Sequence, residues 1–403
     1  MPSMVTFLWH ATRRCTLYLA GLLGLAALIV ACGGVDSGGT GSYAAGPITG
    51  YGSIIVGGVH YDESTARIED DSGTERLADD LQLGMIAEIR ASDPVGVTGM
   101  QSTIATSVRF RSELVGPVEA IDSTLGTLTV LGQKVQINAT TVFDARLAGG
   151  LAALHVNDVV EVFGQLDASA QLRYTATRIE PRTGAASYKL RGIVTAVSSS
   201  GTFKTLVIGG QTFDFSALGS DIRPSRNQLL RVVFGTVKVA GNWVASAIEI
   251  GTRQLPDRDS AEVEGRITAF TSNEMFEVDG IPIAASVLTQ FPDGRAGVVL
   301  GARVEVRGSS SGGTLYATRV SIEGDNSGGP DPFQFTGVIQ LLDTTAQTFV
   351  MRGFTVHWSD STQFATGTNA SSLRNLRKAA VKGALSADGT RLEASSIRIV
   401  TSE

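Results

Sequence analysis

Residues 127–137, TLTVLGQKVQI, decide the fold of this chain. Apolar residues alternate with polar ones on both sides of a glycine, Gly132, and they are Leu128, Val130, Val135 and Ile137. A period of two is typical of strands with one buried face, and a glycine between two such runs indicates a turn. The stretch therefore predicts a β-hairpin.

The hairpin recurs along the chain. Its turn glycine returns at Gly210, Gly280 and Gly353. The residues three positions after the glycine are Val135, Phe213, Ile283 and Val356, and those five positions after it are Ile137, Phe215, Ala285 and Trp358. Apolar columns at every second position predict one face of each hairpin in a core.

Two further motifs keep step with an opening glycine. The opening glycines are Gly46, Gly116, Gly192, Gly265 and Gly337, at spacings of 70, 76, 73 and 72 residues. A second motif, Ala-Thr/Ser-x-Ile/Val, starts at Ala105, Ala176, Ala245, Ala317 and Ala394. A third lies between them, at Val162-Phe163-Gly164, Val233-Phe234-Gly235, Val306-Arg307-Gly308 and Val381-Lys382-Gly383, with Ile89-Arg90-Ala91 as a weaker copy. Such self-similarity indicates tandem structural units.

We predict five units, at residues 46–113, 114–182, 188–252, 261–324 and 333–401. Each reads as a strand, a hairpin, a short helical segment such as 145–156 or 372–381, and a second hairpin. This order favours an all-β fold with short helices, in which each unit is a small OB-like β-barrel. The opening glycine suits a strand that bends through unusual backbone angles to serve both halves of a barrel.

The N-terminus reads as an export signal. Arg13 and Arg14 precede an apolar run that ends at Cys32, with a small residue just before the cysteine. This pattern resembles a bacterial lipoprotein signal, residues 1–31, with Cys32 as the lipidation site. Residues 32–45 are rich in Gly, Ser and Thr and predict a flexible tether. The alternatives are a retained membrane helix, for which the apolar run is short, and an unacylated secreted form. Residue 33 is not aspartate, so we expect an outer-membrane lipoprotein of the cell envelope, facing the periplasm or the surface.

Composition excludes several classes of function. The only cysteines are Cys15 and Cys32, so residues 33–403 hold no thiol for a disulfide, for catalysis or for a metal. Without residues 1–31 the formal charge is about −8. Nucleic-acid binding depends on an excess of Lys and Arg, so we expect no nucleic-acid partner. The expected partners are the membrane, through the N-terminal lipid, and an envelope protein or glycan.

The repeated motifs resemble those of the DUF5666 repeat family of bacterial envelope lipoproteins. The resemblance rests on the opening glycine, Gly-x-x-Val-x-Val-x-Gly, Thr-x-Phe and Ala-Thr-x-Ile, and it covers nearly all of residues 46–400. The opening of the first unit, GPITGYGSIIVGGVHYDESTARIEDD at 46–71, is similar to that of multi-repeat members. The family has no established activity, so the resemblance implies architecture and no chemistry. The first unit departs most, with Ala91 in place of glycine.

Candidate catalytic residues are few. Outside the signal the histidines are His60, His155 and His357, each in a different unit, so no serine triad or clustered metal site is predicted. We expect His357 to be a plain surface residue. The closest carboxylate pairs are Asp70 with Asp71 and Asp79 with Asp80, which favour solvated turns over glycosidase chemistry. Trp243 and Trp358 fall in apolar columns and are expected in the core. We predict no catalytic, metal or cofactor-binding residues.

Three functions remain open at this level. The first is a non-catalytic module that binds an envelope partner or acts as a spacer from the membrane. The second is a binder of a small ligand or oligosaccharide that uses one barrel groove. The third is a hydrolase with two carboxylates facing one cleft. Repetition without a unique polar cluster favours the first.

Overall fold

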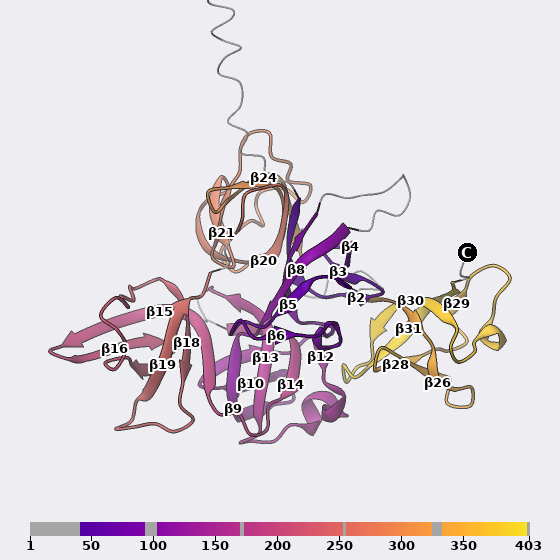
Figure 1. Cartoon of the computed structure of the whole chain (residues 1–403), viewed down its shortest axis with the longest axis horizontal. Helices are drawn as coiled ribbons and strands as arrows, with labels where there is room; N and C mark the ends of the chain where they lie inside the picture. The colour runs from indigo at the N-terminus through magenta and orange to yellow at the C-terminus, as the bar shows by residue number, and fades with distance from the viewer. Residues whose placement is uncertain (1–40, 93–102, 170–172, 253–254, 325–332, 401–403) are drawn as a thin grey trace, which may run out of the picture. The chain divides into compact units, whose positions relative to one another are not determined.

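The computed structural model describes residues 41–92, 103–169, 173–252, 255–324 and 333–400 (Figure 1). These residues all fall in one compact unit of the chain. The secondary structure of the described part consists of strands and four short 3₁₀ turns, with no α-helix. The expectation of an all-β fold is therefore confirmed.

The second unit is a closed five-stranded barrel. Its strands are β9 (Leu114–Asp122), β10 (Thr127–Val130), β11 (Gln133–Gln136), β13 (Val159–Asp167) and β14 (Arg173–Pro181). β9 pairs with β10 and β10 with β11, in antiparallel fashion. β11 then pairs with β14 in parallel, β14 with β13, and β13 returns to β9. A short extra strand, β12 (Val142–Phe143), also pairs with β14.

The same cyclic order of pairing recurs in the third and fourth units. The third contains β15 (Tyr188–Ser200), β16 (Phe203–Ile208), β17 (Gln211–Asp214), β18 (Leu229–Phe234) and β19 (Trp243–Ile250). The fourth contains β20 (Arg258–Ser272), β21 (Met275–Val278), β22 (Ile281–Ala284), β23 (Arg303–Ser311) and β24 (Thr314–Glu323).

In the fifth and first units the first strand of this pairing order is divided into two shorter strands. The fifth contains β25 (Phe333–Val338), β26 (Gln340–Asp343), β27 (Thr348–Met351), β28 (Phe354–His357), β29 (Gln363–Phe364), β30 (Lys378–Leu385) and β31 (Arg391–Ile399). The first contains β1 (Ser42–Pro47), β2 (Gly50–Tyr51), β3 (Ile54–Val56), β4 (Val59–Asp62), β5 (Arg67–Glu69), β6 (Glu75–Arg76), β7 (Ile86–Ala91) and β8 (Thr103–Arg111).

The opening glycines serve close packing, not unusual backbone angles. Their φ values lie outside the left-handed region, which corrects the reason given from the sequence. A Cβ on Gly116 would lie 2.4 Å from Cγ of Leu131, and one on Gly192 would lie 2.6 Å from Cγ2 of Ile208. Leu131, just after β10, and Ile208, at the end of β16, thus occupy the space that a side chain on the glycine would need. The glycine therefore lets the first strand cross directly over the hairpin.

The third motif marks a β-bulge opposite the motif alanine. The register shifts just before the motif glycine in three units, where the pairs are Gly164 with Ala176, Gly308 with Ala317 and Gly383 with Ala394. A Cβ on Gly164 would lie 2.3 Å from the carbonyl oxygen of Thr175, so the bulge requires glycine. In the third unit Phe234 pairs with Ala245, which moves the motif predicted there by one residue.

The predicted short helices are wrong as α-helices. Residues 145–156 form two 3₁₀ turns, η2 (Ala145–Leu147) and η3 (Gly150–Ala153), because Gly149 and Gly150 have φ values of 103° and 62° and break the segment. In the fifth unit only η4 (Ala370–Ser372) is helical, and strand β30 begins at Lys378 within the predicted helix. A further turn, η1 (Ala78–Asp80), lies in the first unit.

Strand β1 begins at Ser42, inside the stretch predicted as a tether up to residue 45. It pairs antiparallel with β7 of its own unit and parallel with β20 of the fourth unit. Its side chains alternate accordingly: Ala44 belongs to the core of the first unit, whereas Tyr43 and Ala45 belong to that of the fourth. The tether prediction was wrong for these residues because a buried tyrosine and two alanines suffice to form a doubly paired strand.

The cores are shared between units. Buried residues of the first and fifth units form one cluster, in which the rings of Tyr51 and Phe335 lie 5.4 Å apart. The second and third units form another cluster. The parallel pair β2–β25 and the antiparallel pair β9–β15 connect these partners through the backbone.

Candidate functional site

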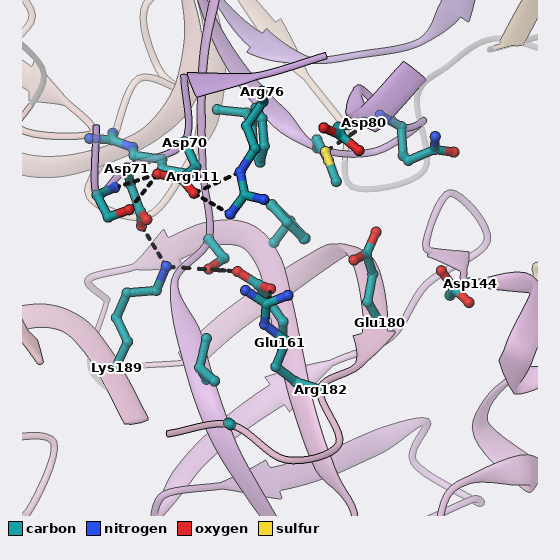
Figure 2. Close-up of a pocket in the computed structure, with 18 of the residues that line it drawn as sticks. Asp70, Asp71, Arg76, Asp80, Arg111, Asp144, Glu161, Glu180, Arg182 and Lys189 are labelled. Atoms are coloured by element: carbon teal, nitrogen blue, oxygen red, sulfur yellow. Dashed lines mark hydrogen bonds and ion pairs between the residues drawn. The ribbon is translucent and has the colours of Figure 1, made fainter. Parts of the chain in front are cut away.

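A charged cleft of about 810 Å³ opens where residues of the first three units meet (Figure 2). Its charged lining residues are Asp70, Asp71, Asp79, Asp80, Asp144, Glu161, Glu180, Arg76, Arg111, Arg146, Arg182, Lys189 and Arg231. All four carboxylates that the sequence singled out therefore line one cleft. The other charged lining residues come from all three units and were not predicted.

Asp70 is held as a carboxylate by a tight turn. Its Oδ1 accepts hydrogen bonds from the backbone nitrogens of Ser72 and Thr74, and its Oδ2 accepts one from Nε of Arg76 at 2.9 Å. Although burial opposes ionisation, the hydrogen bonds from Ser72, Arg76 and Thr74 hold the pKa of Asp70 below its usual value.

Asp71, next in the chain, pairs with another unit. Its carboxylate lies 2.5 Å from Nζ of Lys189 and 3.2 Å from Nη1 of Arg231, both in the third unit. Figure 2 shows the side chains of Asp71 and Lys189 pointing toward one another across the cleft. Of the two neighbouring aspartates, Asp70 therefore stabilises a local turn, whereas Asp71 connects the first unit to the third.

Asp79 and Asp80 lie on the exposed rim, in η1. Oδ2 of Asp80 accepts a hydrogen bond from the backbone nitrogen of Leu77 at 3.0 Å and so caps the 3₁₀ turn. The backbone oxygen of Asp79 accepts one from the side chain of Gln82. These contacts are those of a solvated turn, as the sequence predicted.

Carboxylates of the second unit complete the cleft and pair with neighbouring cations. Asp144 pairs with Arg146 at 2.7 Å, and although burial opposes it, hydrogen bonds from Arg146 and the charge of Arg178 hold its pKa below the usual value. Glu180 lies 2.5 Å from Nε of Arg178. Glu161 accepts a hydrogen bond from Ser112 and pairs with Arg182 at 3.2 Å.

The ion pairs of this cleft join units, and the carboxyl pKa shifts resolved within it are downward. A glycosidase needs one carboxyl group with a raised pKa to donate a proton. The carboxyl groups whose pKa burial raises, Glu262, Glu277 and Glu305, lie outside the cleft. Within it, the pKa values of Asp70 and Asp144 are lowered, and both side chains are already neutralised by arginine.

A buried ion network includes Arg111, which also lines the cleft. Arg191 of β15, 1% exposed, pairs with Glu113 at 2.9 Å and with Asp279 at 2.6 Å. Asp279 also accepts a hydrogen bond from Arg111 at 2.8 Å. The backbone oxygen of Arg191 accepts one from the hydroxyl group of Tyr174. Buried charges therefore join the first, third and fourth units, and the hydroxyl group of Tyr174 connects the second unit to them.

One hydrogen bond recurs where Thr-x-Phe and the alanine motif meet. The hydroxyl groups of Thr141, Thr289 and Thr362 donate to the backbone oxygens of Ala176, Ala317 and Ala394, at 2.7, 2.6 and 2.7 Å. Each threonine oxygen also accepts a backbone hydrogen bond from the residue three positions earlier. In each of these units, the two motifs thus attach the segment before the fourth strand to the fifth strand by a hydrogen bond.

Comparison with protein families matches three segments of the chain, residues 115–180, 264–321 and 336–398, to DUF5666, a domain of unknown function. These three segments are DUF5666 domains. The resemblance predicted from the sequence is therefore confirmed. No curated protein matches the chain.

The three DUF5666 domains are the units that carry the threonine–alanine hydrogen bond and the glycine bulge. The first unit has Ala91 at the bulge, where it pairs with Ala105, and the third has Phe234 there. A glycine and a threonine at two fixed positions hence distinguish the DUF5666 domains from the other two units.

The histidines lie apart, as predicted, but each has a side-chain partner that the sequence did not indicate, which for His155 is Asp158 at 3.6 Å. Nδ1 of His60 lies 3.2 Å from Oγ of Ser53, in the turn between β2 and β3. Burial and the neighbouring Lys382 lower the pKa of His60. The positive charge of Lys382 would therefore oppose the transfer of a proton from Ser53 to His60. His357 is only partly exposed and lies 2.5 Å from Glu393, so it is not the plain surface residue expected.

The remaining predicted residues are placed as follows. Trp243 and Trp358 are buried, as the apolar columns indicated, and Nε1 of Trp243 donates to the side chain of Gln211. Cys32 lies outside the described residues. Within the residues that the structure describes, His, Cys, Asp and Glu form no group of three that could hold a metal ion. No helix in that part has the length and apolarity to cross a membrane.

Proposed function

We propose that this chain is a non-catalytic envelope lipoprotein, anchored through Cys32, whose five units act as binding or spacer modules for a protein or glycan partner. The units are taken to be OB-like barrels throughout, because each follows the cyclic pairing order of the closed second unit. The proposed location is the outer membrane, at its periplasmic face or at the surface.

One observation carries the non-catalytic part of this proposal. Charged side chains at the junctions pair with one another across units, as Arg191 does with Glu113 and Asp279, and as Lys189 does with Asp71. A catalytic site needs a group held in an unfavourable protonation state or an uncommitted nucleophile. The charges of these DUF5666 domains and their neighbours instead hold the units together as a scaffold.

The anchor is tested by fractionation of bacteria that express the full chain. Wild type and Cys15→Ala, which changes the other cysteine, are expected in the outer-membrane fraction, and Cys32→Ala in the soluble fraction. Labelling with radioactive palmitate should mark the first two proteins only. If Cys32→Ala sediments with membranes as completely as wild type, a retained apolar helix holds the chain and the lipid anchor is wrong.

A further inference from the structure

A second cavity, which we call the junction cavity, lies between residues of the first, second, fourth and fifth units. It has a volume of about 270 Å³ and shares no lining residue with the charged cleft. This volume is below the roughly 300–1,000 Å³ of pockets for drug-sized ligands. It exceeds by far the roughly 30 Å³ that one water molecule takes up in the liquid.

The cavity contains a buried amide without a partner. Gln165 of β13 is 6% exposed, and its Nε2 is buried with no hydrogen-bond partner in the described part of the chain. Leaving such a donor unsatisfied costs about 1–3 kcal/mol, so native proteins rarely do so without a bound molecule. Gln165 lines the cavity, which points to a hydrogen-bond acceptor within it.

The charges around Gln165 are balanced and rigidly held. Nη2 of Arg266 donates to Oγ1 of Thr175 at 3.1 Å, and its Nη1 donates to the backbone oxygen of Gly301 at 2.8 Å. Arg303 pairs with Glu264. The lining carries two arginines and three glutamates, the latter being Glu264, Glu305 and Glu323. A site with both signs in nearly equal number favours neither an anion nor a cation.

One part of the lining is apolar. Ile48, Ile55 and Phe333 form this apolar wall and are themselves almost fully buried. Threonine and asparagine side chains add groups that both donate and accept, namely Thr140, Thr175, Thr177 and Asn138. An apolar wall together with amide, guanidinium, carboxylate and hydroxyl groups suits a ligand with hydroxyl edges and a hydrocarbon face.

We propose that the junction cavity binds a neutral polyhydroxylated ligand of the size of one monosaccharide, either free or at the end of a glycan. Gln165 donates to a ligand oxygen, Arg266 and Glu264 bind its hydroxyl groups, and the apolar wall contacts its C–H face. The inference deepens the proposed function, since it assigns the partner to the glycan class.

The experiment is calorimetric titration of the purified full-length protein with single sugars. N-acetylglucosamine and glucose are the neutral probes, and glucuronate and glucosamine are the anionic and cationic comparisons. Saturable binding of at least one neutral probe is expected, with the charged sugars weaker. A chitin oligosaccharide as a further probe separates a terminal glycan residue from a free sugar.

Two variants assign the binding to the cavity. Gln165→Leu removes the amide at nearly constant volume and should weaken binding at least tenfold, while Gln340→Leu makes the same change on an exposed strand and should leave binding unchanged. Gln165→Glu keeps an acceptor but loses the donor, and should also bind weakly. Thermal unfolding without sugar checks that each variant is folded.

Three results would overturn the inference. One is no saturable binding of any neutral sugar at millimolar concentration, which would leave ordered water as the occupant. Another is equal affinity of wild type and Gln165→Leu. The third is a preference for glucuronate or glucosamine. If the protein binds sugar but Cys32→Ala stays with the membranes, only the lipid anchor is wrong. If Cys32→Ala becomes soluble but no sugar binds, only the sugar site is wrong.

Discussion

At the scale of single residues, the repeated motifs are explained by close contacts of the backbone. The sequence correctly predicted the recurring apolar positions of the hairpins, because a strand with one buried face has an apolar residue at every second position. It did not give the reason for the glycines. Gly116 and Gly164 are required by a leucine side chain and a carbonyl oxygen that lie within 2.4 Å of where a Cβ would stand. Such contacts join distant strands and leave no local pattern.

The threonine–alanine hydrogen bond gives a prediction at this scale. Thr141 is buried, donates to Ala176 and accepts from the backbone nitrogen of Asn138. Thr141→Val keeps the shape and removes both hydrogen bonds, so it should lower the free energy of unfolding by about 1–2 kcal/mol. Equilibrium denaturation measures the change.

The control is Thr129→Val, on a half-buried position of β10. It should change the free energy of unfolding by less than about 0.5 kcal/mol. Equal effects of the two substitutions would show that the hydrogen bond of Thr141 does not support the fold. The same loss is expected for Thr289→Val and Thr362→Val.

At the scale of elements, the strands were predicted better than the segments between them. The alternating runs identified most hairpins. The segment at 372–381 was predicted helical, but Lys378–Leu385 is strand β30, because pairing with β25 and β31 outweighs local helix propensity. Strand β1 was missed, since its second partner, β20, lies more than 200 residues away in sequence.

The junction of β1 and β20 also contains a buried carboxyl group. Oε1 of Glu262, in β20, has no hydrogen-bond partner among the residues that the structure describes, while Oε2 lies 3.1 Å from Nε of Arg307. Burial and the charges of Glu305 and Glu264 raise its pKa from 4.5 to about 8, against the effect of Arg307. Tyr61 of β4 faces the same group, and Glu262 contributes to its raised pKa.

This shift predicts lower stability at alkaline pH. Between pH 4.5 and about 8 the unfolded chain releases the proton of Glu262 while the folded chain keeps it. The contribution of this group to the free energy of unfolding should therefore fall through that range, by on the order of 3 kcal/mol. Denaturant titrations at pH 5 and pH 8.5 measure the fall, and Glu262→Gln should remove most of it.

Glu75→Gln, on the exposed strand β6, serves as the control and should retain the pH dependence of wild type. A variant Glu262→Gln that loses stability with pH as steeply as wild type would assign the fall to other groups.

At the scale of the whole molecule, the sequence predicted five units but not the contacts between them. The spacing of the opening glycines defined five units. No local pattern indicates that Asp279 of the fourth unit meets Arg191 of the third and Arg111 of the first. The carboxylates at Asp70 and Asp71 were singled out from sequence, but their arginine and lysine partners come from the folded arrangement. The junction cavity has no trace in the sequence for the same reason.

The Arg191 network should dominate the stability of the assembled units. Arg191→Met leaves Glu113 and Asp279 buried with fewer compensating charges, and we expect a loss of about 3–5 kcal/mol. Arg295→Met breaks the exposed pair with Glu274 and should cost less than about 1 kcal/mol. Chemical denaturation compares the two. Similar losses for both would mean that the buried network does not hold the units together.

The position of β1 has a consequence for how the chain is made. Ser42 pairs with Ser260, and Gly50 of the following strand pairs with Gln334. Synthesis proceeds from the N-terminus, and domains generally fold as they emerge. The first unit must wait for the fourth and fifth before both edges of its leading strands are occupied. These strands, made before the rest of the described fold, therefore complete their pairing only after the partner strands of the fourth and fifth units have been made, and during that delay their edges are open to chaperones.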